Sequence, residues 1–454
     1  MPRSKSSILP KPSANARAAE PVAEAELETV FAIYAGLERI ALAVSGGPDS
    51  LALLHLSLAW RARFAPGRPT FVVLSVDHGL RPEAAAEAAE VVATAAALGL
   101  EARVLIRGAP RSRTGLQAKA RADRYRLLAA AAREVSAQAL ATGHTLDDQA
   151  ETLLMRLARG SGVDGLSAMS PVGSLGHLRL LRPLLGLPKS RLEASLRARA
   201  ITWTVDPSNA NHAFERPRLR ALMPDLIAAG LTPEAIGTSA RRLARGRAAL
   251  EQLTSEAASR LVTIHDEGYF DLDRPGYSAL PEDIQVRLIG HLIARLGTPG
   301  QPERLARLER LVARLGAETT AESNLAGCLI KAGPDRILLL REPGREGLPK
   351  LTVQPGESRD WDRRCRVTVS PAATAGVTVR ALETADLHGH LAAAARSSGL
   401  PRPVLLASPS AWRGAALVAM PVLGFSCTEI VFAPILTLTP LPELDANATE
   451  LMPE

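Results

Sequence analysis

The alternation of β-rich runs with helical stretches over residues 23–205 constrains this chain most. It predicts a parallel, doubly wound α/β sheet. The predicted strands are Ile40–Val44, Thr70–Val76, Ala102–Ile106, Ala139–Thr142 and Leu178–Leu181. The predicted helices lie near residues 49–61, 83–98, 115–135, 147–159 and 188–200. Since such sheets bind ligands at the carboxyl ends of their strands, polar residues gathered there mark the candidate site.

The 454 residues are enough for about three domains. We expect a disordered tail over residues 1–24 and an α/β catalytic domain over 25–224. A helical, arginine-rich domain over 225–322 and a small α+β module over 323–454 would follow. The Gly- and Ser-rich residues 160–176 are either a flexible lid or a plain connector. One predicted helix has an apolar stripe and a separate arginine face, made by Arg307, Arg310 and Arg314, which either is solvated or binds RNA.

Charge and cysteine content narrow the class of protein. The formal net charge is +7, and only six of the 54 basic residues are lysines. This balance suits a nucleic-acid partner, because arginine pairs well with phosphate, but it equally fits a compositional bias of the genome. The three cysteines form no CxxC pair, which argues against a disulfide framework, a zinc ribbon or an iron–sulfur cluster. A reducing, cytoplasmic location without a membrane span is therefore expected.

The first motif is Ser45-Gly46-Gly47-Pro48-Asp49-Ser50, which follows the first predicted strand and opens a helix. Glycines let the backbone approach a phosphate closely, and proline suits a first helical turn. The loop N–H groups and the helix N-terminus would then face an anion, with Ser45 and Ser50 adding hydroxyls. Asp49 is unusual in an anion site and suggests a bound Mg²⁺. The alternative is an ordinary capped strand–turn–helix junction.

This loop carries the SGGxDS signature and is identified as typical of the N-type ATP pyrophosphatase (PP-loop) superfamily. No lysine follows the glycines, so it differs from the GxxxxGK[ST] loop. The resemblance implies an adenine nucleotide α-hydrolase-like fold and cleavage of ATP between its α- and β-phosphates. It does not select the substrate that becomes adenylated.

Further motifs select a family. In chain order they are Ser75–Arg81, Ala120–Tyr125, Ala141–Thr152, Leu153–Gly162, Trp203–Asn209 and Arg216–Arg220. Together they resemble the tRNA(Ile)-lysidine synthetase family over roughly residues 35–225. Two positions depart from the family pattern. Thr145 stands where many relatives have His or Asn, and Pro217 stands where many have Asn, which removes a backbone donor and an amide.

The run from Thr142 to Thr152 can also be interpreted from its residue spacing, without the family resemblance. Asp148 and Glu151 fall near one face of a predicted helix, where two carboxylates would hold Mg²⁺ or orient an amine. His144 would contact a phosphate or an oxygen of the substrate. Alternatively, Thr145 and Asp148 form a capping box, and the helix dipole simply favours acidic residues in the first turn. Spacing alone does not decide between a functional site and a helix cap. Asp147 is consistent with an acidic side chain exposed to solvent.

The resemblance implies roles for individual residues. It makes Asp49, His144, Asp148 and Glu151 catalytic, with Asp49 also the candidate Mg²⁺ ligand. The nucleotide would be held by Ser45, Gly46, Gly47, Pro48, Asp49, Ser50, Asp77 and His78. Phosphate or tRNA contacts would come from Arg121, Arg124, Arg159, Arg216 and Arg220. Arg121 and Arg124 would equally well lie on an exposed helix face.

The implied reaction joins free lysine to C2 of the wobble cytidine in an isoleucine tRNA with a CAU anticodon. It passes through an adenylated cytidine and converts ATP to AMP and pyrophosphate. Relatives that thiolate tRNA need cysteines in or near the catalytic domain, whereas the first cysteine here is Cys328. Synthetases that obtain ammonia from a glutaminase are disfavoured, because no nucleophilic cysteine lies near the N-terminus. Another ATP pyrophosphatase that acts on tRNA and a non-catalytic ATP- or RNA-binding module stay open, as does a homodimer.

Overall fold

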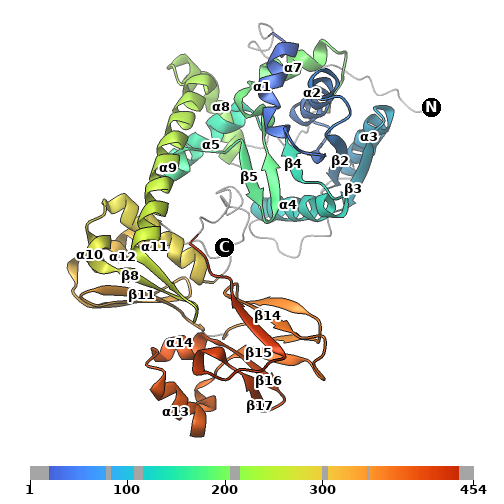
Figure 1. The fold of residues 1–454 in the computed structure, drawn as a ribbon. Coiled ribbons are helices and arrows are strands. Elements are labelled where there is room, and N and C mark those ends of the chain that lie inside the picture. The colour runs from blue at the N-terminus through green and yellow to red at the C-terminus, as the bar shows by residue number, and fades with distance from the viewer. Residues whose placement is uncertain are drawn as a thin grey trace. The chain divides into compact units, whose positions relative to one another are not determined.

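A computed structural model describes residues 20–77, 83–106, 116–204, 215–298, 305–344 and 347–438 (Figure 1). The chain divides into two compact units between Ala248 and Ala249, and each is described by itself. Residues 78–81, which include His78, and residues 205–209 of the predicted motifs, and residues 1–19 of the predicted tail, lie outside the described residues. Within the described residues, no helix is long and apolar enough to cross a membrane.

Unit 1 is built on a six-stranded sheet in the order β3-β2-β1-β4-β6-β5. The strands are β1 (Arg39–Ala43), β2 (Thr70–Asp77), β3 (Glu101–Ile106), β4 (Ala139–Thr142), β5 (Val172–Leu175) and β6 (Leu178–Leu181). All neighbours pair in parallel except β5, which is antiparallel to β6. The predicted doubly wound, mostly parallel α/β fold is therefore confirmed.

Helices cover both faces of this sheet because side chains alternate along each strand. In β1, Ile40 and Leu42 join a core with α1, α2, α3 and α7, whereas Ala41 and Ala43 join a second core under α4. The helices of unit 1 are α1 (Glu24–Val30), α2 (Pro48–Phe64), α3 (Glu83–Ala97), α4 (Leu116–Glu134), α5 (Leu146–Ala158), α6 (Val163–Leu166), α7 (Lys189–Arg197), α8 (Glu215–Ala228) and α9 (Pro233–Leu261), which runs on into unit 2.

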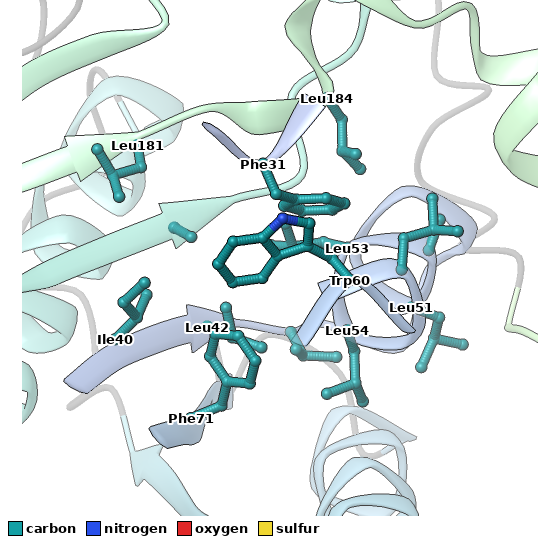
Figure 2. Close-up of a cluster of buried hydrophobic side chains, with 14 of the residues drawn as sticks. Phe31, Ile40, Leu42, Leu51, Leu53, Leu54, Trp60, Phe71, Leu181 and Leu184 are labelled. Carbon is teal, nitrogen blue, oxygen red and sulfur yellow. The ribbon is translucent and has the colours of Figure 1, made fainter. Parts of the chain in front are cut away.

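Aromatic residues are few but concentrated in the first core. The ring centroids of Phe31 and Tyr34 lie 5.2 Å apart, and Trp60 meets the Tyr34 ring edge-on at 5.5 Å. Figure 2 shows Trp60 beside Phe31, with leucines of α2 around it. Such ring pairs add about 0.5–1.5 kcal/mol each beyond the area they bury. They attach the segment after α1 firmly to α2 and the sheet.

The strand order brings two loops together. The chain builds β1, β2 and β3 outward in one direction, then returns to place β4 on the free side of β1. Ligand sites of doubly wound sheets form where the direction reverses, at the carboxyl ends of the two central strands. The loop after β1 and the loop after β4 meet at that point.

The Gly- and Ser-rich segment over residues 160–176 is not the irregular loop that both the lid and the connector interpretations assumed. It contains α6 and β5. The Gln149 side chain donates to the Met169 carbonyl at 2.7 Å and accepts from its N–H at 2.8 Å. The Arg156 guanidinium donates to the carbonyls of Gly165 and Ala168. These bonds from α5 fix the segment in place.

Unit 2 contains three antiparallel sheets. The first has the order β7-β8-β11-β10-β9, from β7 (Val262–His265), β8 (Tyr269–Asp273), β9 (Ala321–Leu325), β10 (Cys328–Ala332) and β11 (Arg336–Arg341). It packs on α11 (Glu282–Leu296) and α12 (Leu305–Ala317), and α10 (Arg274–Ser278) lies beside β8. Since β7 and β8 fall in residues 225–322, that segment is not purely helical as predicted. The three-domain division itself stays a prediction.

The rest of unit 2 consists of two small sheets sharing one core. One has the order β12-β15-β16-β17 and the other β13-β14-β18. Their strands are β12 (Leu351–Val353), β13 (Ser358–Trp361), β14 (Cys365–Val369), β15 (Val377–Ala381), β16 (Pro409–Arg413), β17 (Ala416–Ala419) and β18 (Ile430–Pro434), with α13 (Gly389–Ser397) and α14 (Arg402–Ala407) as helices. All three cysteines lie in unit 2, and all are free thiols.

Candidate nucleotide and ligation site

The loop after β1 has the shape of an anion-binding turn. Gly46 adopts φ +81°, which favours glycine, whereas Gly47 is extended at φ −76° and caps α2, so only the first glycine needs the left-handed region. The Ser50 hydroxyl accepts from the Ser45 N–H at 3.1 Å and donates to the Gly47 carbonyl at 2.9 Å. The carbonyl of Gly46 accepts from the N–H of Thr204 at 3.2 Å. With Pro48 at its start, α2 points its free N–H groups at the loop.

Gly143, in the loop after β4, touches the first turn of α2. A Cβ at this position would lie 2.7 Å from the Asp49 carbonyl oxygen and 3.1 Å from the Ser50 nitrogen. Real Cβ atoms do not approach backbone so closely, so only glycine lets the two loops meet. This residue was not singled out from the sequence.

Asp49 lies in the first turn of α2, and its Oδ2 accepts a hydrogen bond from Lys189 Nζ at 3.0 Å. Its Oδ1 is buried and has no hydrogen-bond partner. Burial raises the pKa of the Asp49 carboxyl to about 6, against the opposing effect of the Lys189 ammonium. Nothing in the spacing of Lys189, 140 residues further along, indicated this pairing.

His144 lies half-buried just after β4. Its Nδ1 forms a hydrogen bond of 2.9 Å with the Thr142 hydroxyl. Burial holds the pKa of His144 well below its ordinary value of 6.5, and the positive charges of Arg182, Arg121 and Arg216 lower it further. The imidazole is therefore neutral near pH 7, despite the nearby Asp148 carboxylate.

Asp148 serves as the partner in a capping box at the start of α5. Its Oδ2 accepts from the N–H of Thr145 at 2.9 Å, and its own N–H donates to the Thr145 hydroxyl at 3.3 Å. Burial alone would raise the pKa of Asp148, but His144, the Thr145 N–H and the arginines of α8 lower it. The neighbouring Asp147 is not simply solvated, because its Oδ2 accepts from the backbone N–H of Lys189 at 2.7 Å.

Glu151 is almost fully buried one turn further along α5. Arg220, on α8, donates from Nε to Glu151 Oε1 at 2.5 Å and from Nη2 to Oε2 at 3.2 Å. The same guanidinium lies 3.8 Å from Asp148 Oδ1. Burial raises the pKa of Glu151 in spite of this bidentate contact. The predicted catalytic residues and Arg220 are thus gathered into one charged cluster.

The remaining predicted residues lie in different surroundings. Asp77 ends β2, next to β1. On α4, the Arg121 guanidinium lies 5.4 Å from the Tyr125 ring centre, and burial lowers the pKa of Arg124. Arg159, at the end of α5, forms an ion pair of 2.6 Å with Glu215. On α8, the charge of Arg216 acts on His144, Asp148 and Glu151.

The predicted Mg²⁺ site depends on Asp49. Among the residues that the structure describes, no group of three or more His, Cys, Asp or Glu side chains is arranged to hold a metal ion. The partnerless Oδ1 of Asp49 still fits a cation whose other ligands are phosphate oxygens and water.

The half of the chain that holds the sheet and the site matches a known kind of domain. A family model described as a PP-loop domain covers residues 19–226. The fold and the loop after β1 thus define a PP-loop nucleotide-binding enzyme.

The relatives are more specific. The chain is 44% identical to the tRNA(Ile)-lysidine synthase of Bradyrhizobium sp., over 72% of this chain and 96% of that protein. Its identity to the enzyme of Rhodopseudomonas palustris is 44%, over 72% and 97%, and to that of Ruegeria pomeroyi 40%, over 86% and 89%. The chain belongs to the tRNA(Ile)-lysidine synthase family. The predicted family and the predicted ATP-dependent ligase are confirmed.

Proposed function

We propose that the chain joins free lysine to C2 of the wobble cytidine of isoleucine tRNA with a CAU anticodon, converting ATP to AMP and pyrophosphate. One observation supports this most. At the point where the strand order reverses, an anion-binding loop lies against a cluster of buried and half-buried carboxylates, a half-buried neutral histidine and more exposed arginines. Both halves of the reaction, adenylation and amine attack, need such groups side by side.

In the first step, the C2 oxygen of cytidine forms a bond to the α-phosphorus of ATP. The bond to the bridging oxygen breaks, and the electron pair leaves with pyrophosphate. The N–H groups of the loop and of the α2 N-terminus bind the phosphates, with the hydroxyls of Ser45 and Ser50 beside them. Asp49 would hold Mg²⁺, which neutralises phosphate charge when bound.

In the second step, the ε-amine of lysine attacks C2 and AMP leaves. The amine must first lose a proton, and the raised pKa of Glu151 makes its carboxylate a better acceptor than an exposed glutamate. Asp148, with its lowered pKa, stays ionised and holds the ammonium. The Nδ1 of neutral His144 is engaged by Thr142, so its Nε2 is the ring nitrogen left for a hydrogen bond to the substrate.

For tRNA, arginines of α4, α8 and the end of α5 are the proposed phosphate contacts. Among the predicted five, Arg121 and Arg216 fit this role best. Arg220 is already paired with Glu151 and Arg159 with Glu215, and desolvation lowers the pKa of Arg124. A cytoplasmic location and a homodimer remain part of the proposal, and light scattering on the purified protein tests the dimer.

Unit 2 offers a second basic surface. A cavity of about 410 Å³ is lined by Arg307, Arg310 and Arg314 of α12 and by Ser323 and Asn324 of β9. The arginines recur at spacings of three and four residues, so they lie on one face of the helix. We propose that this arginine groove contacts the tRNA backbone.

The test measures pyrophosphate release from ATP with and without lysine and with and without the CAU-anticodon tRNA. Release that needs the tRNA, and a lysine-modified tRNA formed only when lysine is present, support the proposal. ATP binding without turnover would favour a non-catalytic module instead. Sulfur transfer is disfavoured by chemistry, because burial raises the pKa of Cys328 and of Cys365 to about 12 and keeps both as thiols.

A further inference from the structure

Lys189 is a cation in a place that ordinarily disfavours one. It is the first residue of α7, where the helix dipole opposes positive charge. Its backbone N–H donates to Asp147 Oδ2 at 2.7 Å, and its Nζ donates to Asp49 Oδ2 at 3.0 Å. The backbone is therefore fixed, while the side chain reaches across to the loop after β1.

Only one of the two carboxylate oxygens of Asp49, the partner of Lys189, has a hydrogen bond. Asp49 Oδ1 is buried without a hydrogen bond, although Oδ2 is paired. The Lys189 side chain is 40% exposed and that of Asp49 is 27% exposed, so Lys189 is the more exposed member of the pair. A flexible four-carbon stem that is partly exposed can move without disturbing the core.

The loop itself contains no lysine. In loops of the GxxxxGK[ST] type, a lysine from the loop reaches the phosphates beyond the α-phosphate. Here the loop supplies glycines, hydroxyls and an aspartate, but no cation. Lys189 brings a positive charge to within one hydrogen bond of the first turn of α2, which is where an anion would sit.

We propose that Lys189 binds the pyrophosphate portion of ATP. With the loop empty, its ammonium neutralises Asp49. With ATP bound, it contacts a β- or γ-phosphate oxygen, and Asp49 is left to the cation that accompanies ATP. As the bond from the α-phosphorus to the bridging oxygen breaks, the ammonium stabilises the charge that stays on pyrophosphate. This inference rests on the proposed function for the position of ATP.

The test is equilibrium binding of inorganic pyrophosphate, ATP and AMP, measured by calorimetry without tRNA or lysine. We expect Lys189→Gln to weaken pyrophosphate and ATP about 10- to 100-fold, the range for one charge-assisted hydrogen bond. AMP binding should change less than about twofold. Lys189→Arg should recover much of the loss. Arg197→Gln is the matched control, because Arg197 lies on the same helix and forms its ion pair with Glu193 across one turn.

A second comparison separates phosphate binding from mere neutralisation of Asp49. Without divalent cation, the double variant Asp49→Asn/Lys189→Gln should bind pyrophosphate more weakly than Asp49→Asn alone. Equal affinities would show that Lys189 only balances Asp49, and would overturn the proposal. So would an equal loss of AMP and pyrophosphate binding in Lys189→Gln. Because neither assay needs tRNA or lysine, a failed ligation would leave these results unchanged.

Discussion

His144 shows how far a residue's surroundings can change what its sequence position suggests. Next to Asp148 in the charged cluster, a histidine would ordinarily be expected to gain a proton. Burial and three arginines outweigh that carboxylate and lower its pKa. The charge state thus follows from residues of β4, α4, α8 and the segment after β6, which no local pattern reveals.

The first prediction concerns this charge state. Ring ¹⁵N spectra of His144 should show a neutral imidazole at pH 6.5. Because the folded pKa lies below 6.5, protonation favours the unfolded chain. The contribution of His144 to stability is complete above pH 6.5 and is lost as the pH falls below it. A His144 signal that titrates at the ordinary histidine value of 6.5 would contradict this.

A second prediction is that Asp49→Ala abolishes pyrophosphate release. The variant removes the carboxylate whose Oδ1 has no protein partner, and with it the proposed cation ligand. Release from ATP should be measured with lysine and tRNA present. Asp123→Ala, an acid on α4 that pairs with Arg126, serves as the control and should retain release. Near-normal release from Asp49→Ala would refute the role assigned to the loop.

A third prediction tests the contact between the two loops. Gly143→Ala should displace the first turn of α2, because its Cβ would lie 2.9 Å from the Asp49 carbonyl carbon. We expect a loss of about 1–3 kcal/mol in stability and at least roughly tenfold weaker ATP binding. Gly186→Ala is the control, since a Cβ there meets nothing within 4 Å. Equal behaviour of the two variants in melting and in nucleotide binding would argue against a tight junction.

Among the secondary-structure elements, the predicted strands and helices of unit 1 agree with the structure to within a few residues. Long apolar runs ended by Gly, Pro or charged residues made them predictable. The hairpin β5–β6 was only half predicted and β7–β8 was missed. Their strands have four or five residues, too few for periodicity to stand out. Gly176 and Gly268, both at positive φ in the turns, were the available signal.

The candidate site was predictable in part for a similar reason. Motifs lying within one loop or one helical turn, such as Ser45–Ser50 and the capping box at Thr145, could be interpreted from spacing. Contacts between distant elements could not. Arg220 on Glu151 and Lys189 on Asp49 depend on how α8 and α7 pack against α5 and α2.

The pairing of α8 with α5 gives a fourth prediction. Arg220→Met should cost about 1–3 kcal/mol in the free energy of unfolding, because Glu151 would stay buried without its bidentate partner. Urea denaturation measures this. Arg218→Met, on an exposed position of the same helix, should cost little. Adding Glu151→Gln to Arg220→Met should restore part of the loss; a further loss in that double variant would count against the ion pair.

In the molecule as a whole, the proposed ligation site and the arginine groove belong to different units. Every described residue of the proposed ligation site lies before Ala248, whereas the arginine groove lies after it. A large, folded RNA is a substrate that two separate surfaces on one chain can serve. The strongly arginine-rich composition is consistent with that division, although a genome bias would add to it.

The fifth prediction follows from this division. Replacing Arg307, Arg310 and Arg314 together by Gln should weaken tRNA binding and reduce its salt dependence, by about 0.9 in log–log slope for each phosphate that is no longer neutralised. Pyrophosphate binding should be unchanged, since the loop after β1 lies in unit 1. Filter binding over a range of salt concentrations measures the slope. An unchanged slope would show that the groove is simply solvated.

The pairing of β4 with β1 has a consequence for how the enzyme is made. Ile40 and Ala139 are neighbours in the sheet, yet α2, β2, α3, β3 and α4 lie between them in the chain. Closing so long a loop is slow compared with forming adjacent hairpins or helices. During synthesis, the loop after β1 therefore emerges long before its partner loop exists. We expect the growing chain to acquire affinity for ATP only after β4 has been inserted.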